Sequence, residues 1–358
     1  MAMNILYTIF SLGIGGAEKL LVDIVNNWDK NSEDNIYVCI INNKIEKSLL
    51  DKIDDNINVI QLNRNEGDKN IKHLFQYMNI IRKYKIDVIH CQSNDTVRFS
   101  LFSKMLNPKI KIYYTVHDTN TFNKLKGIDI IVNNIICNNI IAISSSVYKE
   151  IVERKIDDKK VKIVYNGIDL SMYSTKKEIH ESINIACVAR IIPRKKGQDI
   201  LINSIKEVKS KYPNVKCYLV GDTDNNTEKV SLKKLVDDNN LENQIVFTGN
   251  IDNIPRFLEK IDIIVMPSRY EGFGLALIEA MASKIPVIAS DIDGPKEIIK
   301  DNQYGMLFKS EDSEELAKKI IYLIENKDEK KIENAYKYVA NNYSIKRMVN
   351  RLAEIYNA

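Results

Sequence analysis

Residues 261–299 read IDIIVMPSRYEGFGLALIEAMASKIPVIASDIDGPKEII, and this stretch decides the fold. Two short apolar runs, IDIIVMPS (261–268) and IPVIAS (285–290), flank a segment that reads as a helix. Apolar runs of this length are typical of strands that are buried on both faces of a sheet. Glycines at 272 and 274 disfavour helix, so we expect the helix to begin near Gly274. The stretch therefore predicts one strand–helix–strand unit of a parallel sheet.

The same pattern recurs along the whole chain in two series. Apolar runs predict strands at 4–10, 35–41, 86–90, 111–116, 139–144 and 162–166, and again at 183–190, 216–221, 244–249, 261–268 and 285–290. The intervening segments read as helices. The sequence thus predicts an α/β fold, with two Rossmann-like, doubly wound domains that face each other across a cleft.

The length of 358 residues also fits two domains. The segment 166–182 is polar and rich in turn-forming residues, so we expect it to be the linker. We place an N-terminal domain at 1–168, a C-terminal domain at 169–342 and a final helix at 343–358. In a fold of this kind, ligands bind in loops that follow the strands.

Composition excludes several classes of protein. Hydrophobic residues make up 44% and charged residues 28%, a balance that excludes disorder and coiled coil. The net charge of +4 is too small to indicate a nucleic-acid partner, although residues 1–165 hold the whole excess, with 23 basic and 19 acidic side chains. The basic segments 72–85 and 104–111 fit contact with an anionic membrane and solvated helix faces equally well.

Cysteine usage and the N-terminus favour a cytoplasmic protein. The five cysteines are far apart in the sequence and lie mostly in or beside apolar runs, which indicates reduced thiols and no zinc site. The first basic residue is Lys19, so the apolar start lacks the charge of a signal peptide. No clean apolar run reaches the length of a transmembrane helix.

The loop SLGIGGAEK (11–19) follows the first predicted strand and opens a helix. Its glycines would let backbone amides approach a phosphate. Gly13 and Gly15 fit the dinucleotide fingerprint G-x-G-x-x-G, but Glu18 stands at the third glycine position. A nicotinamide site is therefore disfavoured, and a tight turn without a ligand is the alternative.

Two carboxylates stand out in the deciding stretch. Glu271 falls in the loop before the predicted helix, and Glu279 lies a little over one turn inside it. The amides of Gly274 and Leu275 would meet a diphosphate at the positive end of this helix. Each carboxylate can accept hydrogen bonds from a pair of sugar hydroxyls. A solvent-facing Glu279 is less favoured, because its neighbours in the helix are apolar.

This stretch resembles the retaining glycosyltransferases of family 4, which have the GT-B fold and the signature Glu-x7-Glu. The resemblance extends over nearly the whole chain, in motifs that share the family's order and spacing: GGAE (15–18), HD (117–118), SSS (144–146), NGID (166–169), ARIIPRKKG (189–197), GD (221–222), PSRYEGFG (267–274) and GPKE (294–297). The loop GDTDNN (221–226) departs from the family by lacking a second glycine.

The resemblance implies a role for each matching residue of the second domain. Glu279 would bind the ribose of a nucleotide donor, and Glu271 would contact the transferred sugar. Arg190 and Lys196 would grip the diphosphate, with Lys195 as an alternative to Lys196. The remaining donor-binding positions of this domain are Asn250, Ile251, Gly272, Phe273, Gly274 and Leu275.

In the first domain the resemblance implies that His117 acts at the sugar and that Gly15 and Gly16 lie near the diphosphate. From the residues alone, His117 would more simply be a buried core histidine. The final helix would cross back to pack on the first domain. The basic run RIIPRKK, taken alone, is also compatible with a solvated surface.

The implied activity is that of a retaining hexosyltransferase. It would move a sugar from a nucleotide-diphosphate donor, most simply a UDP-sugar, to a glycan or lipid-linked glycan, as in cell-surface polysaccharide or glycolipid synthesis. We expect no metal and no cofactor, no nucleic-acid partner, and a cytoplasmic protein that contacts the inner face of the membrane at most peripherally. Alternatives are an epimerase or phosphorylase on the same fold, or a non-catalytic nucleotide-sugar-binding subunit.

Overall fold

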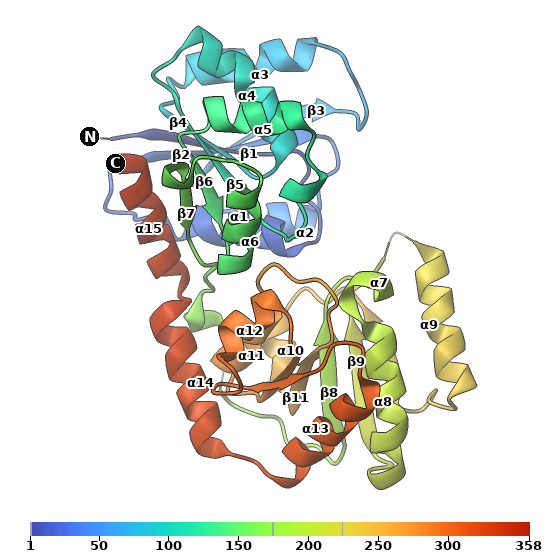
Figure 1. Ribbon diagram of the computed structural model, residues 1–358. Coiled ribbons are helices and arrows are strands. Elements are labelled where there is room, and N and C mark those ends of the chain that lie inside the picture. Colours follow the sequence, from blue (N-terminus) through green and yellow to red (C-terminus); the bar gives the residue numbers. More distant parts are fainter. Residues whose placement is uncertain (1, 174, 224) are drawn as a thin grey trace. The chain divides into compact units, whose positions relative to one another are not determined.

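The computed structural model describes residues 2–173, 175–223 and 225–358 and divides the chain into two compact units (Figure 1). Unit 1 contains Met1–Gly167 and Ile345–Ala358, and unit 2 contains Ile168–Ser344. Ser174, in the predicted linker, and Asp224, in the loop GDTDNN, lie outside the described residues.

Unit 1 is built on a sheet of parallel strands in the order β3-β2-β1-β4-β5-β6-β7. The strands are β1 (Asn4–Ile9), β2 (Asn35–Asn42), β3 (Asn58–Arg64), β4 (Val88–Cys91), β5 (Lys111–Val116), β6 (Asn139–Ala142) and β7 (Val161–Ile163). The central strands are almost wholly buried, which agrees with their continuous apolar runs.

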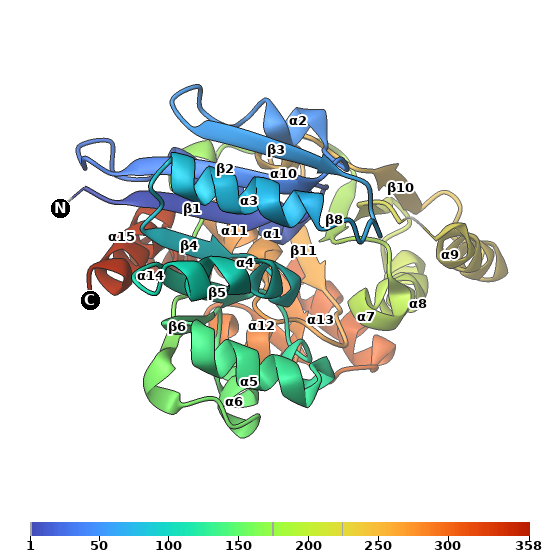
Figure 2. The same ribbon diagram turned by 90° about the horizontal axis from the view of Figure 1, so that it is seen from above.

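Helices cover both faces of this sheet. They are α1 (Gly16–Asn26), α2 (Lys47–Leu50), α3 (Lys72–Lys83), α4 (Asn94–Leu106), α5 (Gly127–Ile136), α6 (Ser145–Glu153) and α15 (Ile345–Asn357), with short 3-10 turns η1 (Phe122–Lys124) and η2 (Asp158–Lys160). Helices α1 and α15 pack together on one face, and α4 contacts both α3 and α5 on the other (Figures 1 and 2). The order of strands and helices is that of a doubly wound fold.

Helix α15 packs on unit 1 although it ends the chain. Its buried side chains recur every three or four residues and form one apolar stripe: Ile345, Met348, Val349, Leu352, Ile355 and Tyr356. The Tyr356 hydroxyl bonds Tyr7 Oη at 3.2 Å and also contacts His90 Nδ1, while its ring stacks on Trp28. The C-terminus is thereby built into the core of the first sheet.

Unit 2 repeats the architecture with parallel strands in the order β10-β9-β8-β11-β12-β13. The strands are β8 (Ile183–Val188), β9 (Val215–Val220), β10 (Ile245–Gly249), β11 (Ile263–Met266), β12 (Val287–Ser290) and β13 (Met306–Phe308). The helices are α7 (Pro193–Lys196), α8 (Gln198–Lys211), α9 (Asn226–Asp238), α10 (Ile254–Leu258), α11 (Leu275–Ala282), α12 (Asp293–Ile299), α13 (Ser313–Glu325) and α14 (Glu329–Asn342), with the 3-10 turn η3 (Leu170–Met172). Helix α8 contacts α9 and α13, while α11 contacts α12 and α14.

The structure corrects the predicted strands in two places. Strand β3 was not predicted, because polar residues interrupt its short apolar pattern and it lies at the edge of the sheet. Strand β13 has only three residues, too few to give a pattern. His117 follows the predicted strand 111–116, which is the fourth predicted strand. Because β3 precedes it in the chain, this strand is the fifth of unit 1 in the structure.

Most of the predicted linker is packed against unit 2. The Lys177 ammonium donates to the carbonyls of Leu258 and Ile261 at 3.2 and 3.0 Å, and the amide of Glu178 donates to Glu259 O. Tyr173 is buried. The compact units divide at Gly167 and Ile168, so the segment 168–182 belongs to unit 2 and is not a free tether.

All five cysteines are buried and carry free thiols. Burial raises the pKa of the Cys39, Cys91 and Cys187 thiols to about 12, so they stay protonated at neutral pH. In the described part of the chain, no helix combines the length and apolarity needed to cross a bilayer.

We predict that replacing Tyr356 by Ala lowers the free energy of unfolding of unit 1 by about 3–5 kcal/mol, because it opens a cavity beside Trp28. Trp28 is the only tryptophan in the sequence, so its fluorescence during urea unfolding reports on unit 1 alone. Tyr356→Phe keeps the ring and removes the partner of His90 Nδ1, while Nε2 keeps its bond to Thr115, and should cost less, about 1–3 kcal/mol. An unchanged midpoint for Tyr356→Ala would contradict the packing of α15 on unit 1.

Candidate active site

The residues expected to hold the donor lie at one edge of the sheet of unit 2. Because the strands are parallel, the loops that follow them all emerge at their carboxyl ends. Arg190 follows β8, Asn250 and Ile251 follow β10, and Glu271 lies between β11 and α11. Topology alone therefore brings these four positions to the same edge.

Two glycines let the loops of this edge touch through their backbones. A Cβ on Gly197 would lie 1.9 Å from the carbonyl oxygen of Pro267, and a Cβ on Gly294 would lie 2.6 Å from that of Glu271. Neither distance is possible for a real side chain. The loop after β8 and helix α12 are thus pressed directly onto the loop that carries Glu271.

Helix α11 begins where the sequence predicted. Gly274 is its N-cap with φ of 116°, and Leu275 is its first residue. Gly272, Phe273 and Gly274 are buried, and the Phe273 ring packs edge-on against Tyr343. These residues therefore form a rigid entry to the helix, whose positive end suits an anionic group.

Glu271 is paired with Lys196. The Lys196 ammonium lies 2.6 Å from Glu271 Oε2, and both side chains are largely shielded from solvent. The Lys195 carbonyl accepts hydrogen bonds from the amides of Arg269 and Tyr270. The Lys196 ammonium and the Lys195 backbone therefore both contact the loop that carries Glu271.

Arg190 is exposed at the end of β8, where its carbonyl accepts a hydrogen bond from Gln198 Nε2 at 2.9 Å. Among the described residues its guanidinium has no ion-pair partner. An exposed guanidinium on a fixed backbone suits a phosphate ligand.

Glu279 is buried, with 6% of its surface exposed, and accepts a hydrogen bond from the Tyr173 hydroxyl at 2.8 Å. This arrangement excludes the solvent-facing alternative for Glu279. The bond also ties the start of unit 2 to α11, two segments that are 106 residues apart in the sequence.

Arg269 also holds the loop that carries Glu271 in place. Its guanidinium donates to both carboxylate oxygens of Asp199 at 2.8 and 2.9 Å, to Glu311 and to the carbonyl of Pro193. Hydrogen bonds to the two carboxylates raise the pKa of Arg269 further, so it is always charged. Arg269 therefore anchors both loops that carry Lys196 and Glu271.

Asn250 and Ile251 follow the edge strand β10, with Asn250 exposed and Ile251 half-buried. The preceding carbonyl, of Gly249, accepts a hydrogen bond from the amide of Gly221 at 2.9 Å. This bond joins the loops after β9 and β10 at the outer end of the same edge.

In unit 1 the predicted residues again lie at the carboxyl ends of the strands. Gly15 is the N-cap of α1 after β1, and Gly16, its first residue, is exposed. His117 follows β5 and is half-buried. Its Nε2 lies 2.8 Å from Gln92 Oε1, at the end of the neighbouring strand β4. An amide oxygen only accepts, so Nε2 carries the proton and Nδ1 is left with a lone pair.

The surroundings of His117 favour its neutral form. Burial lowers its pKa to about 4, while the nearby carboxylate of Asp118 opposes that shift. The loop that follows is fixed by Glu150, whose carboxylate accepts from the amides of Asn120 and Asn123 at 2.6 and 3.0 Å. His117 is therefore a held, uncharged imidazole at the edge of its sheet.

Sequence reasoning missed Gln92, Tyr173 and Arg269, which orient His117, Glu279 and the Glu271 loop. Gln92 had one usable signal, because it lies two residues after the predicted strand 86–90. Tyr173 lies inside the predicted linker 166–182, and nothing in the sequence connects it to Glu279.

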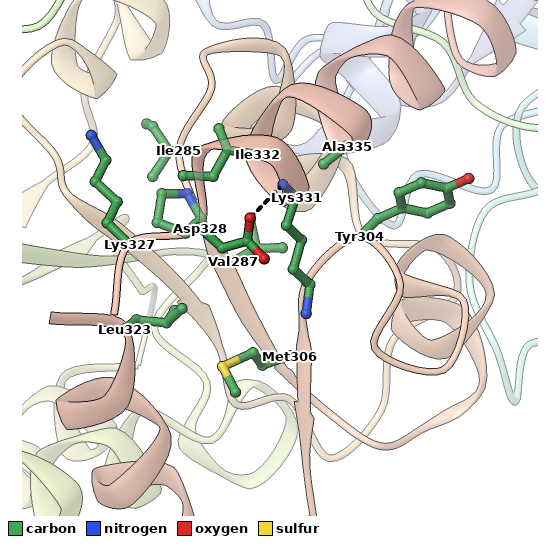
Figure 3. A pocket seen from close by; sticks show the side chains of 12 residues that line it. Ile285, Val287, Tyr304, Met306, Leu323, Lys327, Asp328, Lys331, Ile332 and Ala335 are labelled. Carbon is green, nitrogen blue, oxygen red and sulfur yellow. Dashed lines mark hydrogen bonds between the residues drawn. The ribbon is translucent and has the colours of Figure 1, made fainter. Parts of the chain in front are cut away.

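A small cavity lies elsewhere in unit 2, near the first residues of β12 and β13 (Figure 3). It is lined by Val287, Tyr304, Met306, Lys331 and Ile332, among others, and its volume is about 30 Å³. That space holds little more than a water molecule. It lies at the amino ends of the strands, so it is not the site of the predicted residues.

Over residues 2–173, 175–223 and 225–358, no group of three or more His, Cys, Asp or Glu side chains is placed to hold a metal ion.

Comparison with known proteins identifies the family of the chain. The model of the glycosyl transferases group 1 matches residues 173–341, and that of glycosyltransferase family 4 matches residues 14–172. An uncharacterized 41.2 kDa protein in the cps region of Klebsiella pneumoniae is 30% identical, over 94% of this chain and 95% of that protein. The UDP-Gal:alpha-D-GlcNAc-diphosphoundecaprenol alpha-1,3-galactosyltransferase of Escherichia coli is 24% identical, over 80% and 79% of the two chains.

Among solved structures, Anabaena Alr3699/HepE in complex with UDP and glucose superposes with a TM-score of 0.87, covering 99% of this chain and 100% of that one at 21% identity. This likeness confirms the fold, two parallel-sheet α/β domains of the GT-B type. By the two family models that it matches, the protein is a glycosyltransferase in class. The two matched models together span almost the whole chain, which belongs to glycosyltransferase family 4.

We predict that His117 stays neutral down to about pH 4, with its proton on Nε2. Imidazole ¹⁵N and ¹H NMR shifts over a pH titration measure both properties. The unfolded chain takes up this proton near pH 6.5, so His117 lowers the free energy of unfolding as the pH falls from 6.5 towards 4 and has no such effect above. Gln92→Leu removes the acceptor that holds the His117 proton on Nε2, so the tautomer with the proton on Nδ1 should become populated. His180, bonded to its own loop, serves as the unaffected control, and a protonated Nδ1 in the unaltered protein would contradict the assignment.

Proposed function

We propose that this chain is a retaining hexosyltransferase that moves a sugar from a UDP-sugar to a glycan or a lipid-linked glycan. The observation that carries the proposal is the cluster at the carboxyl edge of unit 2, where the Lys196–Glu271 pair lies at the entry to α11 and buried Glu279 lies within that helix. Family membership supports the reaction class.

The proposed donor and acceptor draw on the named relatives. The Escherichia coli relative uses UDP-Gal and a diphosphoundecaprenol-linked sugar, and Anabaena Alr3699/HepE binds UDP and glucose. The Klebsiella relative belongs to a cps region. These names favour a UDP-sugar and an acceptor used in cell-surface polysaccharide or glycolipid synthesis.

In the proposed complex, Glu279 accepts hydrogen bonds from the ribose hydroxyls while Tyr173 holds its carboxylate in place. The diphosphate lies at the amide end of α11 and draws the Lys196 ammonium away from Glu271, with Arg190 as the second cation. Glu271 is then available to the hydroxyls of the sugar. His117 of unit 1, with its Nδ1 lone pair, is proposed as a hydrogen-bond acceptor for a sugar hydroxyl.

Retention by double displacement requires a carboxylate nucleophile beside the anomeric carbon. In the proposed complex the carboxylate of Glu271 binds the sugar hydroxyls, and that of Glu279 is held by Tyr173 and binds the ribose, so neither carboxylate is assigned the role of nucleophile. We therefore favour front-face transfer. The acceptor oxygen bonds to the anomeric carbon as the bond to the diphosphate breaks, and the leaving phosphate takes the acceptor's proton. Lys196 and Arg190 stabilise the charge that develops on the diphosphate.

The decisive experiment supplies a panel of UDP-sugars with glycan and lipid-linked acceptors. We expect UDP release that depends on the acceptor, and a product with the anomeric configuration of the donor by NMR. Donor turnover without an acceptor would instead indicate an epimerase. Donor binding without turnover on any acceptor would favour a non-catalytic subunit.

We predict that Glu279→Ala weakens UDP binding by about 10- to 100-fold, because the ribose loses a buried acceptor. Isothermal titration calorimetry measures the change. Tyr173→Phe should weaken binding less, since it only frees the carboxylate. Glu314→Ala, which removes an exposed carboxylate of α13, is the matched control. Equal affinity for Glu279→Ala and the unaltered protein would remove Glu279 from the donor site.

We also predict that transfer continues in excess chelator, because Arg190 and Lys196 supply the positive charge at the diphosphate. Initial rates with and without chelator should agree within error. A rate that collapses in chelator and returns with added Mg²⁺ or Mn²⁺ would overturn the metal-independent mechanism.

We also propose that the protein works in the cytoplasm, because its five buried free thiols fit a reducing compartment.

A further inference from the structure

Helix α5 of unit 1 is oriented with its polar side chains inward. Asp129 and Asn133 are buried, at 3% and 0% exposure, whereas Ile128, Ile131 and Ile135 are exposed at 61%, 54% and 71%. The ordinary helix of a soluble protein has the opposite orientation. The three exposed isoleucines, Ile128, Ile131 and Ile135, form an apolar stripe along α5 that faces away from the core.

Buried polar contacts fix this orientation. The Asp129 carboxylate accepts from the Arg98 guanidinium and from the amide of Lys126, and the Asn133 amide donates to Asn94 Oδ1 at 2.7 Å. Turning the helix to bury its isoleucines would break these hydrogen bonds, including the charge-assisted bond between Arg98 and Asp129. The exposed stripe is therefore a stable feature of the fold.

The neighbouring helices extend the apolar surface. Figure 2 shows α3, α4 and α5 side by side, and α4 contacts both others. Near its C-terminal end α4 exposes Phe102, Met105 and Leu106, while Phe75 is exposed on α3. We call the outward surface of these three helices the α3–α5 face. Several large exposed apolar side chains on three neighbouring helices indicate an interaction surface.

Charge identifies the partner. Exposed lysines lie at the ends of these helices in the chain: Lys72 begins α3, Lys109 follows α4 and Lys124 precedes α5. Helix α3 contains no carboxylate, α5 contains only the buried Asp129, and Asp95 on α4 is paired with Arg98. A second copy of the chain would bring like charges together, whereas anionic phospholipid supplies both apolar chains and negative headgroups.

We propose that the α3–α5 face docks on an anionic membrane surface, with the isoleucines of α5 entering the headgroup region and the lysines contacting lipid phosphates. The sequence offered only the basic segments as a hint of such contact. The inverted α5, which has no basic residue of its own, supplies the apolar half of the interaction. Docking does not depend on the transferase chemistry of unit 2.

The test is flotation of the full chain with vesicles of phosphatidylcholine, with and without phosphatidylglycerol. We expect binding to the anionic vesicles only, weakened by high salt. Replacing Ile128, Ile131 and Ile135 by Gln should reduce the vesicle affinity at least about tenfold. Replacing Lys72, Lys109 and Lys124 by Gln should do the same and abolish the salt dependence.

Matched controls remove similar side chains from unit 2. Ile179→Gln with Val230→Gln takes away exposed apolar groups, and Gln at Lys233, Lys318 and Lys330 takes away exposed charges. Binding equal to that of the unaltered protein is expected for both sets. Trp28 fluorescence checks that the unit 1 variants fold, and thermal unfolding followed by circular dichroism checks the unit 2 controls. Absence of anionic-vesicle binding, or face variants that bind like the controls, would overturn the proposal. So would a dimer, measured by light scattering, that the isoleucine variant converts to monomer without any vesicle binding.

Discussion

Direct backbone contact between loops is the constraint on which the candidate site of unit 2 depends. The carbonyls of Pro267 and Glu271 occupy space that a side chain at Gly197 or Gly294 would fill. This contact holds the loop after β8 against the loop before α11 without any side chain between them. Lys196 and Glu271 can then meet at 2.6 Å although 75 residues separate them in the sequence.

Side-chain contacts then orient the individual groups. Arg269 bonds Asp199, Glu311 and the carbonyl of Pro193, so the two loops cannot separate without breaking several charged hydrogen bonds. In unit 1 the analogous contact is weaker, a single hydrogen bond from His117 to Gln92. The charged cluster of unit 2 suits the binding of an anion. The neutral imidazole of His117 in unit 1 suits contact with an uncharged sugar.

The two helical surfaces of unit 1 show how one sheet can serve two purposes. One face is closed by α1 and the C-terminal helix α15, where Tyr356 joins Tyr7, Trp28 and His90 in a core without exposed polar groups. The other carries α3, α4 and α5, which leave large apolar side chains in solvent.

The sequence by itself determined the two parallel sheets, the start of α11 at Gly274 and the family, because these depend on patterns between neighbouring residues. Buried strands need continuous apolar runs, glycine disfavours helix, and the spacing of Glu271 and Glu279 is local. It did not reveal β3, whose edge position permits a mixed pattern, or that 168–182 packs on unit 2. Only the tertiary structure joined Tyr173 to Glu279, Gln92 to His117 and Lys196 to Glu271, and only it showed that α5 buries its polar side. Each of these depends on a partner that lies far along the chain, and a pattern of near neighbours carries no information about such a partner.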